Sequence, residues 1–245
     1  LNTPSSKDLY YISVENRVVK LYKVQNDRNK AVIQPQLLAT FSRLKQGELV
    51  QGAARVENTV YLGTSLGNVY TFTVAESEES QPLLPLTDNM YDHIYDIASV
   101  GDSFYFLTPN SIFLSSYDNG IVDKKGTNPA QTNMLVYGDN VILWSRDTRK
   151  PVQLLDVETG KLTTLFTPKS SVQVLRLFGD TLIDIEGNSS VNSYSLTSQQ
   201  TEQLYLGAGL QDAVLTTATD LYVAKSAATN PNVPLLHVEI GRAHV

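Results

Sequence analysis

The chain has 245 residues, of which 42% are hydrophobic and 18% charged, and its formal net charge is −6. The acidic balance argues against a general nucleic-acid binder, which needs a basic face, and the lack of cysteine excludes disulfides, thiol nucleophiles and thiolate metal sites. No run of about 18 apolar residues occurs, so the sequence contains no candidate for a membrane-spanning helix.

One strand-like phrase recurs six times along the chain, each time as a polar turn followed by β-branched, aromatic and leucine residues. The first apolar residues of the copies are Leu9, Val60, Phe104, Val141, Leu182 and Leu221. These anchors are separated by 37 to 51 residues, and a period of about 40–45 residues with several strands in each unit is typical of a propeller blade. We therefore predict an all-β fold, a β-propeller of four-stranded antiparallel blades.

Within the repeats, alternating and β-branched runs predict the individual strands. In chain order they cover residues 69–74, 94–100, 104–108, 111–116, 134–137, 141–144, 172–178, 182–185, 213–216, 221–224 and 234–238, with a short edge strand from Ile121. Gly-Asp turns at Gly101, Gly138 and Gly179 lead into three of the second strands. The best helical candidate, residues 39–45, is short.

The first repeat begins at its second strand and the last one stops after its third. We therefore expect about six blades of a seven- or eight-bladed ring, with residues 1–238 forming a partial propeller. The last seven residues, 239–245, resemble the translation of a sequencing-adapter oligonucleotide, and we expect them to be a non-native tail.

The segment 154–162, Leu-Leu-Asp-Val-Glu-Thr-Gly-Lys-Leu, resembles the hairpin between third and fourth strands of PQQ-like and YVTN-type bacterial propeller repeats. The Trp-Asp dipeptide of WD40 repeats is missing, because Ser145 follows the single tryptophan, Trp144. The resemblance covers most of the chain at the level of the fold and one hairpin at the level of the motif. It implies a PQQ-like or WD40-like propeller, but no residues match a quinone site, and we expect no cofactor.

The strongest candidate for chemistry is the segment Tyr91-Asp92-His93, which precedes a predicted first strand. A histidine beside aspartates can act as a base or a metal ligand, although a solvated loop capped by Asp92 explains the same residues. A catalytic metal site usually needs about three protein ligands, and this segment offers one histidine, so we predict no metal site. Likewise no Gly-x-Ser-x-Gly elbow occurs, and Asp118-Asn119-Gly120 matches a hairpin turn better than a calcium loop.

The only basic cluster is Arg146-Asp147-Thr148-Arg149-Lys150, between a second and a third strand. In a propeller these loops share a face with the loops that lead into first strands. We therefore predict one binding surface formed by Tyr91, Asp92, His93, Gln131, Asn133, Arg146, Arg149, Lys150, Gln211 and Asp212. Arginine and aromatic residues dominate binding hot spots, which favours Tyr91 and the arginines as contacts.

The loops expected at the central funnel hold one histidine and mostly Asn, Gln and Ser, which favours binding over catalysis. We predict a non-catalytic binding or scaffold propeller that presents its loop face to a protein or an extracellular polymer such as a polysaccharide. Two alternatives stay open: a propeller enzyme (hydrolase, lyase or quinoprotein) with its site in the funnel, and a sensor domain of a larger envelope protein. The absence of cysteine favours a bacterial periplasmic or cell-surface location, and nothing indicates an oligomer.

Overall fold

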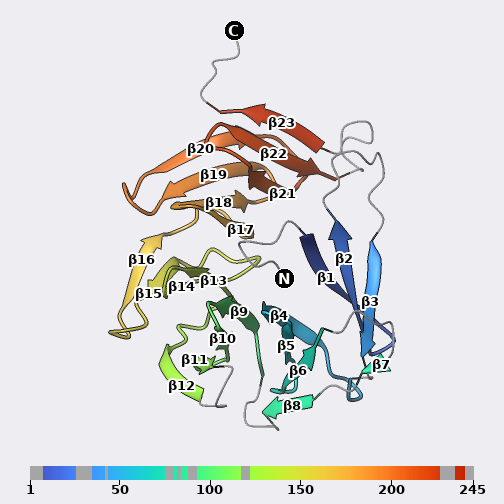
Figure 1. Ribbon diagram of the computed structural model, residues 1–245. Helices are drawn as coiled ribbons and strands as arrows, with labels where there is room; N and C mark the ends of the chain where they lie inside the picture. Colours follow the sequence, from blue (N-terminus) through green and yellow to red (C-terminus); the bar gives the residue numbers. More distant parts are fainter. Residues whose placement is uncertain are drawn as a thin grey trace. The chain divides into compact units, whose positions relative to one another are not determined.

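The computed structural model describes residues 8–25, 35–41, 44–74, 80–81, 84–87, 93–116, 122–226 and 235–240 (Figure 1). In this part of the chain all regular structure is β-strand, arranged in six sheets. The all-β fold that the repeats predict is therefore confirmed. No helix that could cross a membrane occurs among these residues.

The first sheet has the order β1 (Asp8–Glu15), β2 (Val18–Gln25), β3 (Gln36–Phe41) and β7 (Ser80–Gln81), and the second has β4 (Val50–Val56), β5 (Thr59–Thr64), β6 (Val69–Thr73) and β8 (Leu84–Thr87). The third sheet contains β9 (Asp96–Val100), β10 (Ser103–Leu107), β11 (Ser111–Ser116) and β12 (Val122–Thr127). The fourth contains β13 (Asn133–Tyr137), β14 (Asn140–Trp144), β15 (Val152–Leu155) and β16 (Leu162–Phe166). The fifth contains β17 (Val172–Phe178), β18 (Thr181–Glu186), β19 (Ser190–Ser195) and β20 (Thr201–Leu206), and the sixth β21 (Leu210–Leu215), β22 (Asp220–Lys225) and β23 (Leu235–Glu239).

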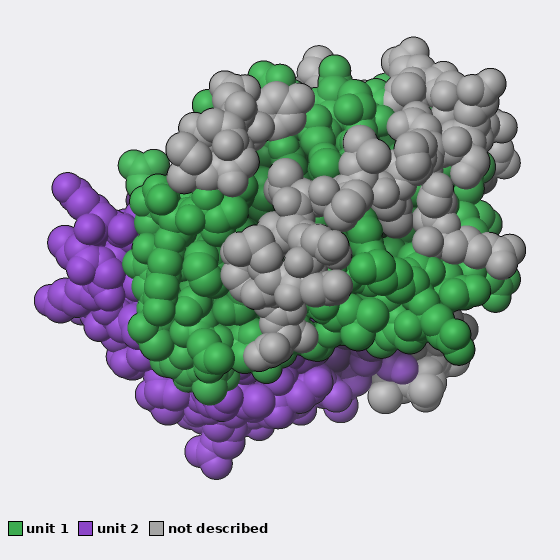
Figure 2. All heavy atoms as spheres, turned by 90° about the horizontal axis from the view of Figure 1, so that it is seen from below, with its two compact units in different colours: residues 1–139 green, residues 140–245 purple. Residues whose placement is uncertain are grey.

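Neighbouring strands pair antiparallel, with the exception of β7, which adds two residues to β3 in parallel. The chain divides into two compact units, residues 1–139 and 140–245, coloured separately in Figure 2. The division falls in the turn between β13 and β14, and each unit is described by itself below.

The predicted anchors occupy the same place in every repeat: each is the second residue of its strand. Five of them, Val60, Phe104, Val141, Leu182 and Leu221, are at most 1% exposed. In four of these five strands the residue before the anchor is half-buried, so burial begins at the anchor; Thr59 of β5, which is 5% exposed, is the exception. The sequence repeat is therefore a repeat of buried positions.

The core forms where the faces of successive sheets pack together. In unit 1, Leu21 and Phe41 of the first sheet pack in one cluster with Val60 and Phe72 of the second. The rings of Phe41 and Phe72 stack at 3.5 Å between centroids. A second cluster joins Tyr61 to Phe104 of the third sheet. In unit 2, the fifth and sixth sheets share a cluster that contains Ile183, Val191, Leu221 and Val223.

The segment that comes nearest to a helical pattern begins as a strand. Residues 39–41 belong to strand β3, although the segment 39–45 has the composition of a short helix. Ala39 and Phe41 are both 0% exposed and lie on the core-facing side, and the register Lys20–Thr40 fixes them against β2. Packing against a neighbouring strand thus outweighs a weak helical propensity. The predicted turn at 118–120 lies outside the described residues.

The Asp-x-x-Thr-Gly-Lys hairpin is confirmed as the turn between β15 and β16. Oδ1 of Asp156 accepts from the backbone N–H groups of Glu158 and Thr159, at 3.1 and 2.9 Å. These bonds hold the pKa of Asp156 below its ordinary value, the largest contribution coming from the Thr159 amide. Gly160 has a φ of 70°, a conformation that glycine adopts without strain.

Candidate functional site

One backbone hydrogen bond recurs along the chain and fixes which loops share an end of the sheets. In each case the turn that follows a second strand accepts a bond from the segment that leads into the next sheet's first strand, at 2.7 to 3.1 Å. The donor and acceptor pairs are Leu44 to Arg17, Ile94 to Thr64 and Asn128 to Asn110 in unit 1, and Val172 to Thr148 and Leu210 to Asn188 in unit 2. Within each unit these turns and leading segments therefore lie at one end of the sheets, called the turn end below.

The basic loop, residues 146–150, lies at the turn end of unit 2. The N–H of Asp147 donates to the carbonyl of Val172 at 2.7 Å, and the Val172 N–H donates to Thr148 at 2.9 Å. Asp147 adopts a φ of 59°, and the hydroxyl of Thr148 donates to the Ser145 carbonyl at 3.2 Å. These bonds fix the backbone of the loop, while the side chains of Arg146, Arg149 and Lys150 are exposed.

A polar cavity of about 400 Å³ lies beside residues 167–170, which lead into β17. Glu186, which is 9% exposed, accepts from the backbone N–H groups of Lys169 and Ser170 at 3.0 and 2.9 Å through one oxygen, Oε2. Its neighbour two residues earlier, Asp184, accepts from the Asn192 side-chain amide at 2.9 Å. Burial, with a smaller contribution from the nearby Glu186 carboxylate, raises the pKa of Asp184 to about 7 against the opposing hydrogen bond from Asn192.

The side chains on the next two strands continue this polar chain. The amide of Gln203 donates to Ser190 Oγ at 2.9 Å, and the Ser190 hydroxyl donates to Asn192 Oδ1 at 2.8 Å. The hydrogen bonds thus run from Gln203 to Asp184 without a gap. This cluster cannot be recognised in the sequence, because its members lie on three strands and form no local motif.

In unit 1 the predicted site residues have different surroundings. The His93 ring is half-buried and lies 4.8 Å from the ring of Tyr95. Gln131 is 1% exposed, and its backbone is held by Asn128, so its side chain does not face solvent. Asn133 is half-buried at the start of β13. Gln131 is thus corrected from a surface contact to a buried residue, whereas Tyr91 and Asp92 lie outside the described residues.

Asp96, at the start of β9, connects two first strands of unit 1. Its Oδ1 accepts from Ile97 N–H and its Oδ2 from Met134 N–H, both at 2.9 Å. Burial raises the pKa of Asp96 to about 6, although these two amide bonds oppose the shift. Its carboxylate thus supports the strand that carries Asn133.

The two remaining predicted residues lie at the start of β21 in unit 2. Gln211 is exposed. Asp212 accepts two hydrogen bonds from Arg176 of β17, at 3.1 and 2.7 Å, and a third from Ala213 N–H at 2.9 Å. Its carboxylate is therefore engaged in an exposed ion pair. That all the predicted residues form one surface across both units stays a prediction.

Glu48, in the segment that leads into β4, is a buried acid that the sequence analysis did not single out. Oε1 accepts from Thr64 Oγ1 at 2.6 Å and Asn68 Nδ2 at 2.7 Å, and Oε2 accepts from Tyr70 OH at 3.0 Å and Lys45 N–H at 3.1 Å. Burial by itself raises the pKa of Glu48, but these bonds outweigh it and hold the pKa below its ordinary value. A carboxylate with four donors is a structural anchor and a poor general base. Among the described residues no three His, Asp or Glu side chains are grouped so that they could hold a metal ion.

No protein-family model and no curated protein matches this chain. Solved structures do resemble it. YCF48 bound to a D1 peptide is similar over 98% of this chain and 84% of that one, with a TM-score of 0.63 and 10% sequence identity. The computationally designed protein Ika8 is similar over 87% of this chain and 67% of its own, with a TM-score of 0.58 and 11% identity. At such identities the likeness shows the fold alone, and it supports a propeller-like fold.

Proposed function

We propose that this chain is a non-catalytic binding propeller whose basic loop binds an acidic segment of a partner protein. The observation that carries the proposal is the pair of backbone bonds between the loop and Val172. A surface cation held on a fixed backbone loses less conformational entropy on binding than one on a free loop. Arg146, Arg149 and Lys150 therefore form a preorganised cationic surface at the turn end of unit 2.

Arginine suits this role because its guanidinium pairs with carboxylates through two parallel hydrogen bonds. The loop contributes two arginines and one lysine against one acid, Asp147. The rest of the chain is acidic, with a net charge of −6, so the loop is a local exception to the overall charge. An acidic partner is therefore attracted to this loop more than to the remaining surface.

Two further observations favour binding over catalysis. The buried carboxylates Glu48 and Glu186 accept bonds from the leading segments of their own units, so their chemistry serves to hold those segments. In addition, YCF48 was solved with a bound D1 peptide. By analogy of fold, we carry over only that a propeller-like fold can accept a peptide.

The proposal is tested by selecting ligands from a phage-displayed peptide library on the immobilised protein. We expect the enriched peptides to be rich in Asp and Glu. The affinity of a synthesised peptide should fall about tenfold when Arg146 and Arg149 are both replaced by alanine, because truncated hot-spot arginines typically cost more than 1 kcal/mol. Fluorescence anisotropy measures the affinity, and the melting temperature should stay nearly unchanged, since both side chains are exposed.

Lys161→Ala provides the matched control. Lys161 is an exposed cation in the turn between β15 and β16, at the opposite end of the same sheet. The Lys161→Ala variant should leave the affinity for the acidic peptide unchanged. Peptides without acidic residues, or an affinity that is insensitive to the Arg146/Arg149 double variant, would contradict the proposal.

A further inference from the structure

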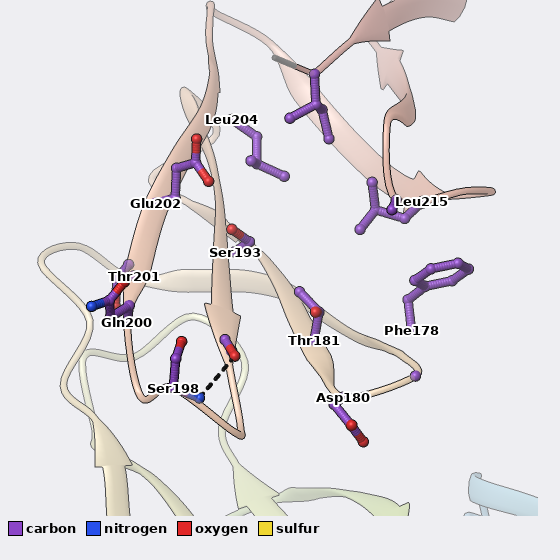
Figure 3. A pocket seen from close by; sticks show the side chains of 14 residues that line it. Phe178, Asp180, Thr181, Ser193, Ser198, Gln200, Thr201, Glu202, Leu204 and Leu215 are labelled. Atoms are coloured by element: carbon purple, nitrogen blue, oxygen red, sulfur yellow. Dashed lines mark hydrogen bonds between the residues drawn. The ribbon is translucent and has the colours of Figure 1, made fainter.

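A second cavity of unit 2 lies at the end of the sheets opposite to the turn end. It has a volume of about 650 Å³ and is bounded by the turn between β17 and β18, the turn between β19 and β20, and the start of β20 (Figure 3). None of the residues of the basic loop lines it. It is therefore a second candidate site, independent of the proposed function.

One side of this cavity is apolar. Phe178 and Leu215 lie on one side of the view in Figure 3, and Leu204 lies above its centre. Phe178 is 37% exposed, so its ring is available to a ligand, whereas Leu215 is 7% exposed and belongs to the core between the fifth and sixth sheets. An accessible aromatic ring beside the buried Leu215 and the half-buried Leu204 offers a surface for a flat or aliphatic group.

The other side is polar and acidic. Glu202, Thr201 and Gln200 lie across the cavity from Phe178, and the hydroxyls of Ser193 and Thr181 lie between the two sides (Figure 3). The residues that line the cavity include two acids, Asp180 and Glu202, and no lysine, arginine or histidine. Glu202 is exposed and forms no ion pair with any other described residue. The charge of the cavity wall therefore favours a cation.

A neighbouring cavity of about 490 Å³ extends the site along β20. It shares Glu202, Leu204 and Ile240 with the first, and it runs between Gln203 and Tyr205 on one side and residues 236–240 on the other. β20 is the last strand of its sheet in the described part of the chain. A ligand with one cationic side chain and a flanking extended backbone would fit both cavities.

We propose that the cavity beside Phe178 and Glu202 binds an arginine side chain of a partner peptide. The guanidinium pairs with the carboxylate of Glu202 through two N–H groups, and its remaining N–H groups meet the hydroxyl of Ser193, while the flanking part of the peptide packs on the ring of Phe178 across the cavity. The aliphatic part of the side chain packs on Leu204 and Leu215. Arginine is preferred to lysine because only its planar group pairs with a carboxylate through two parallel hydrogen bonds and still donates in further directions.

The test uses a blocked pentapeptide, Gly-Gly-Arg-Gly-Gly, titrated into the ¹⁵N-labelled protein and followed by NMR. The same peptide with citrulline, which has the shape of arginine without its charge, is the matched ligand control. The arginine peptide should shift the amide signals of residues 178–181 and 200–204, and the citrulline peptide should bind at least about threefold more weakly, as expected for an exposed charge pair. This comparison uses the unaltered protein and does not depend on the folding of a variant.

Variants then locate the site. Glu202→Gln should lower the affinity for the arginine peptide about threefold and remove the difference in affinity between the arginine and citrulline peptides. Glu158→Gln neutralises an exposed acid outside the cavity. It should change neither the affinity for the arginine peptide nor the difference in affinity between the arginine and citrulline peptides. The Arg146→Ala/Arg149→Ala double variant should also bind normally, which separates this inference from the proposed function. The proposal would be overturned if the two peptides bound equally well or if neither bound. It would also be overturned if the amide signals shifted only for residues outside the two cavities.

Discussion

Gly52 lies directly against Asp96. A Cβ atom at Gly52 would stand 2.9 Å from the Asp96 Cα and 2.5 Å from the Ile97 nitrogen, distances that real Cβ atoms do not show. Gly52 and Asp96 occupy equivalent positions, each eight residues before the anchor of its repeat. In unit 1 the first strands β4 and β9 can therefore approach each other closely only because the earlier one has no side chain at this point.

Replacement of Gly52 by alanine should accordingly lower the free energy of unfolding by about 3 kcal/mol, the upper part of the range for overpacked positions, because both nearest atoms belong to the backbone. Urea denaturation measures the change. Gly179→Ala is the matched control, since a Cβ there meets open space and the strain comes from its φ of 54° alone, worth about 1 kcal/mol. The close approach of β4 and β9 would be refuted if alanine at 52 were tolerated as well as alanine at 179.

Glu48 gives a prediction about acid. Because its folded-state pKa lies below the ordinary value, its contribution to stability is present above about pH 4.5 and is lost as the pH falls through the folded pKa. Glu48→Gln should cost about 2–3 kcal/mol at pH 7, the range for hydrogen bonds to a charged group, and the deficit should shrink below pH 4.5. Thermal unfolding between pH 3 and pH 7 checks this, with the exposed Glu57→Gln as control. A deficit independent of pH would show that shape, and not charge, is what the site requires.

The repeat could be predicted from the sequence because burial recurs at one fixed point of each second strand, as at Val60, Phe104 and Leu182. The polar clusters could not. Glu48 follows a glycine in a segment that has the composition of a solvated turn, and three of its four donors come from positions 16 to 22 residues later, on β5 and β6 and in the turn between them. Such contacts depend on how strands pair across a hairpin, which no local pattern encodes.

The same limit applies to the predicted binding surface. The basic loop was found because four of its five residues are charged, yet what fixes its backbone is the bond to Val172, a residue 24 positions after Thr148. Gln131 lies in a polar segment of the kind found in surface loops, but it is 1% exposed. The Asn128 side chain binds both the backbone N–H and the backbone carbonyl of Gln131. Polarity alone does not distinguish a residue that meets a partner from one that supports a turn.

Asp184 should respond to pH in the opposite direction to Glu48. Its folded-state pKa of about 7 lies above the ordinary value of 3.8, so the folded protein holds the proton more tightly, and stability falls as the pH rises from about 4 to about 7. Asparagine copies the protonated carboxyl, because its oxygen can accept from Asn192 while its NH₂ donates to Glu186. Asp184→Asn should therefore raise the free energy of unfolding on the order of 2 kcal/mol at pH 8 and change it little at pH 4.

Chemical denaturation at both pH values tests the prediction, and Asp102→Asn, which alters an exposed acid, serves as control. A gain of equal size at pH 4 would mean that the amide improves packing and that ionisation of Asp184 is not involved. A loss at pH 8 would mean that the charged carboxylate is the form that Asn192 stabilises.

The ion pair between Arg176 and Asp212 should contribute little to stability, although its geometry is bidentate. The two side chains are 51% and 45% exposed, and water screens a pair of this kind to about 0.2–1 kcal/mol. A double-mutant cycle with Arg176→Ala and Asp212→Ala should give a coupling energy in this range, reduced further in 1 M salt. Asp212→Ala should be the more harmful single change, because Asp212 also accepts from Ala213 N–H. A coupling energy above about 2 kcal/mol would show that the pair is shielded from water, and would make Asp212 a structural residue instead of a contact for a partner.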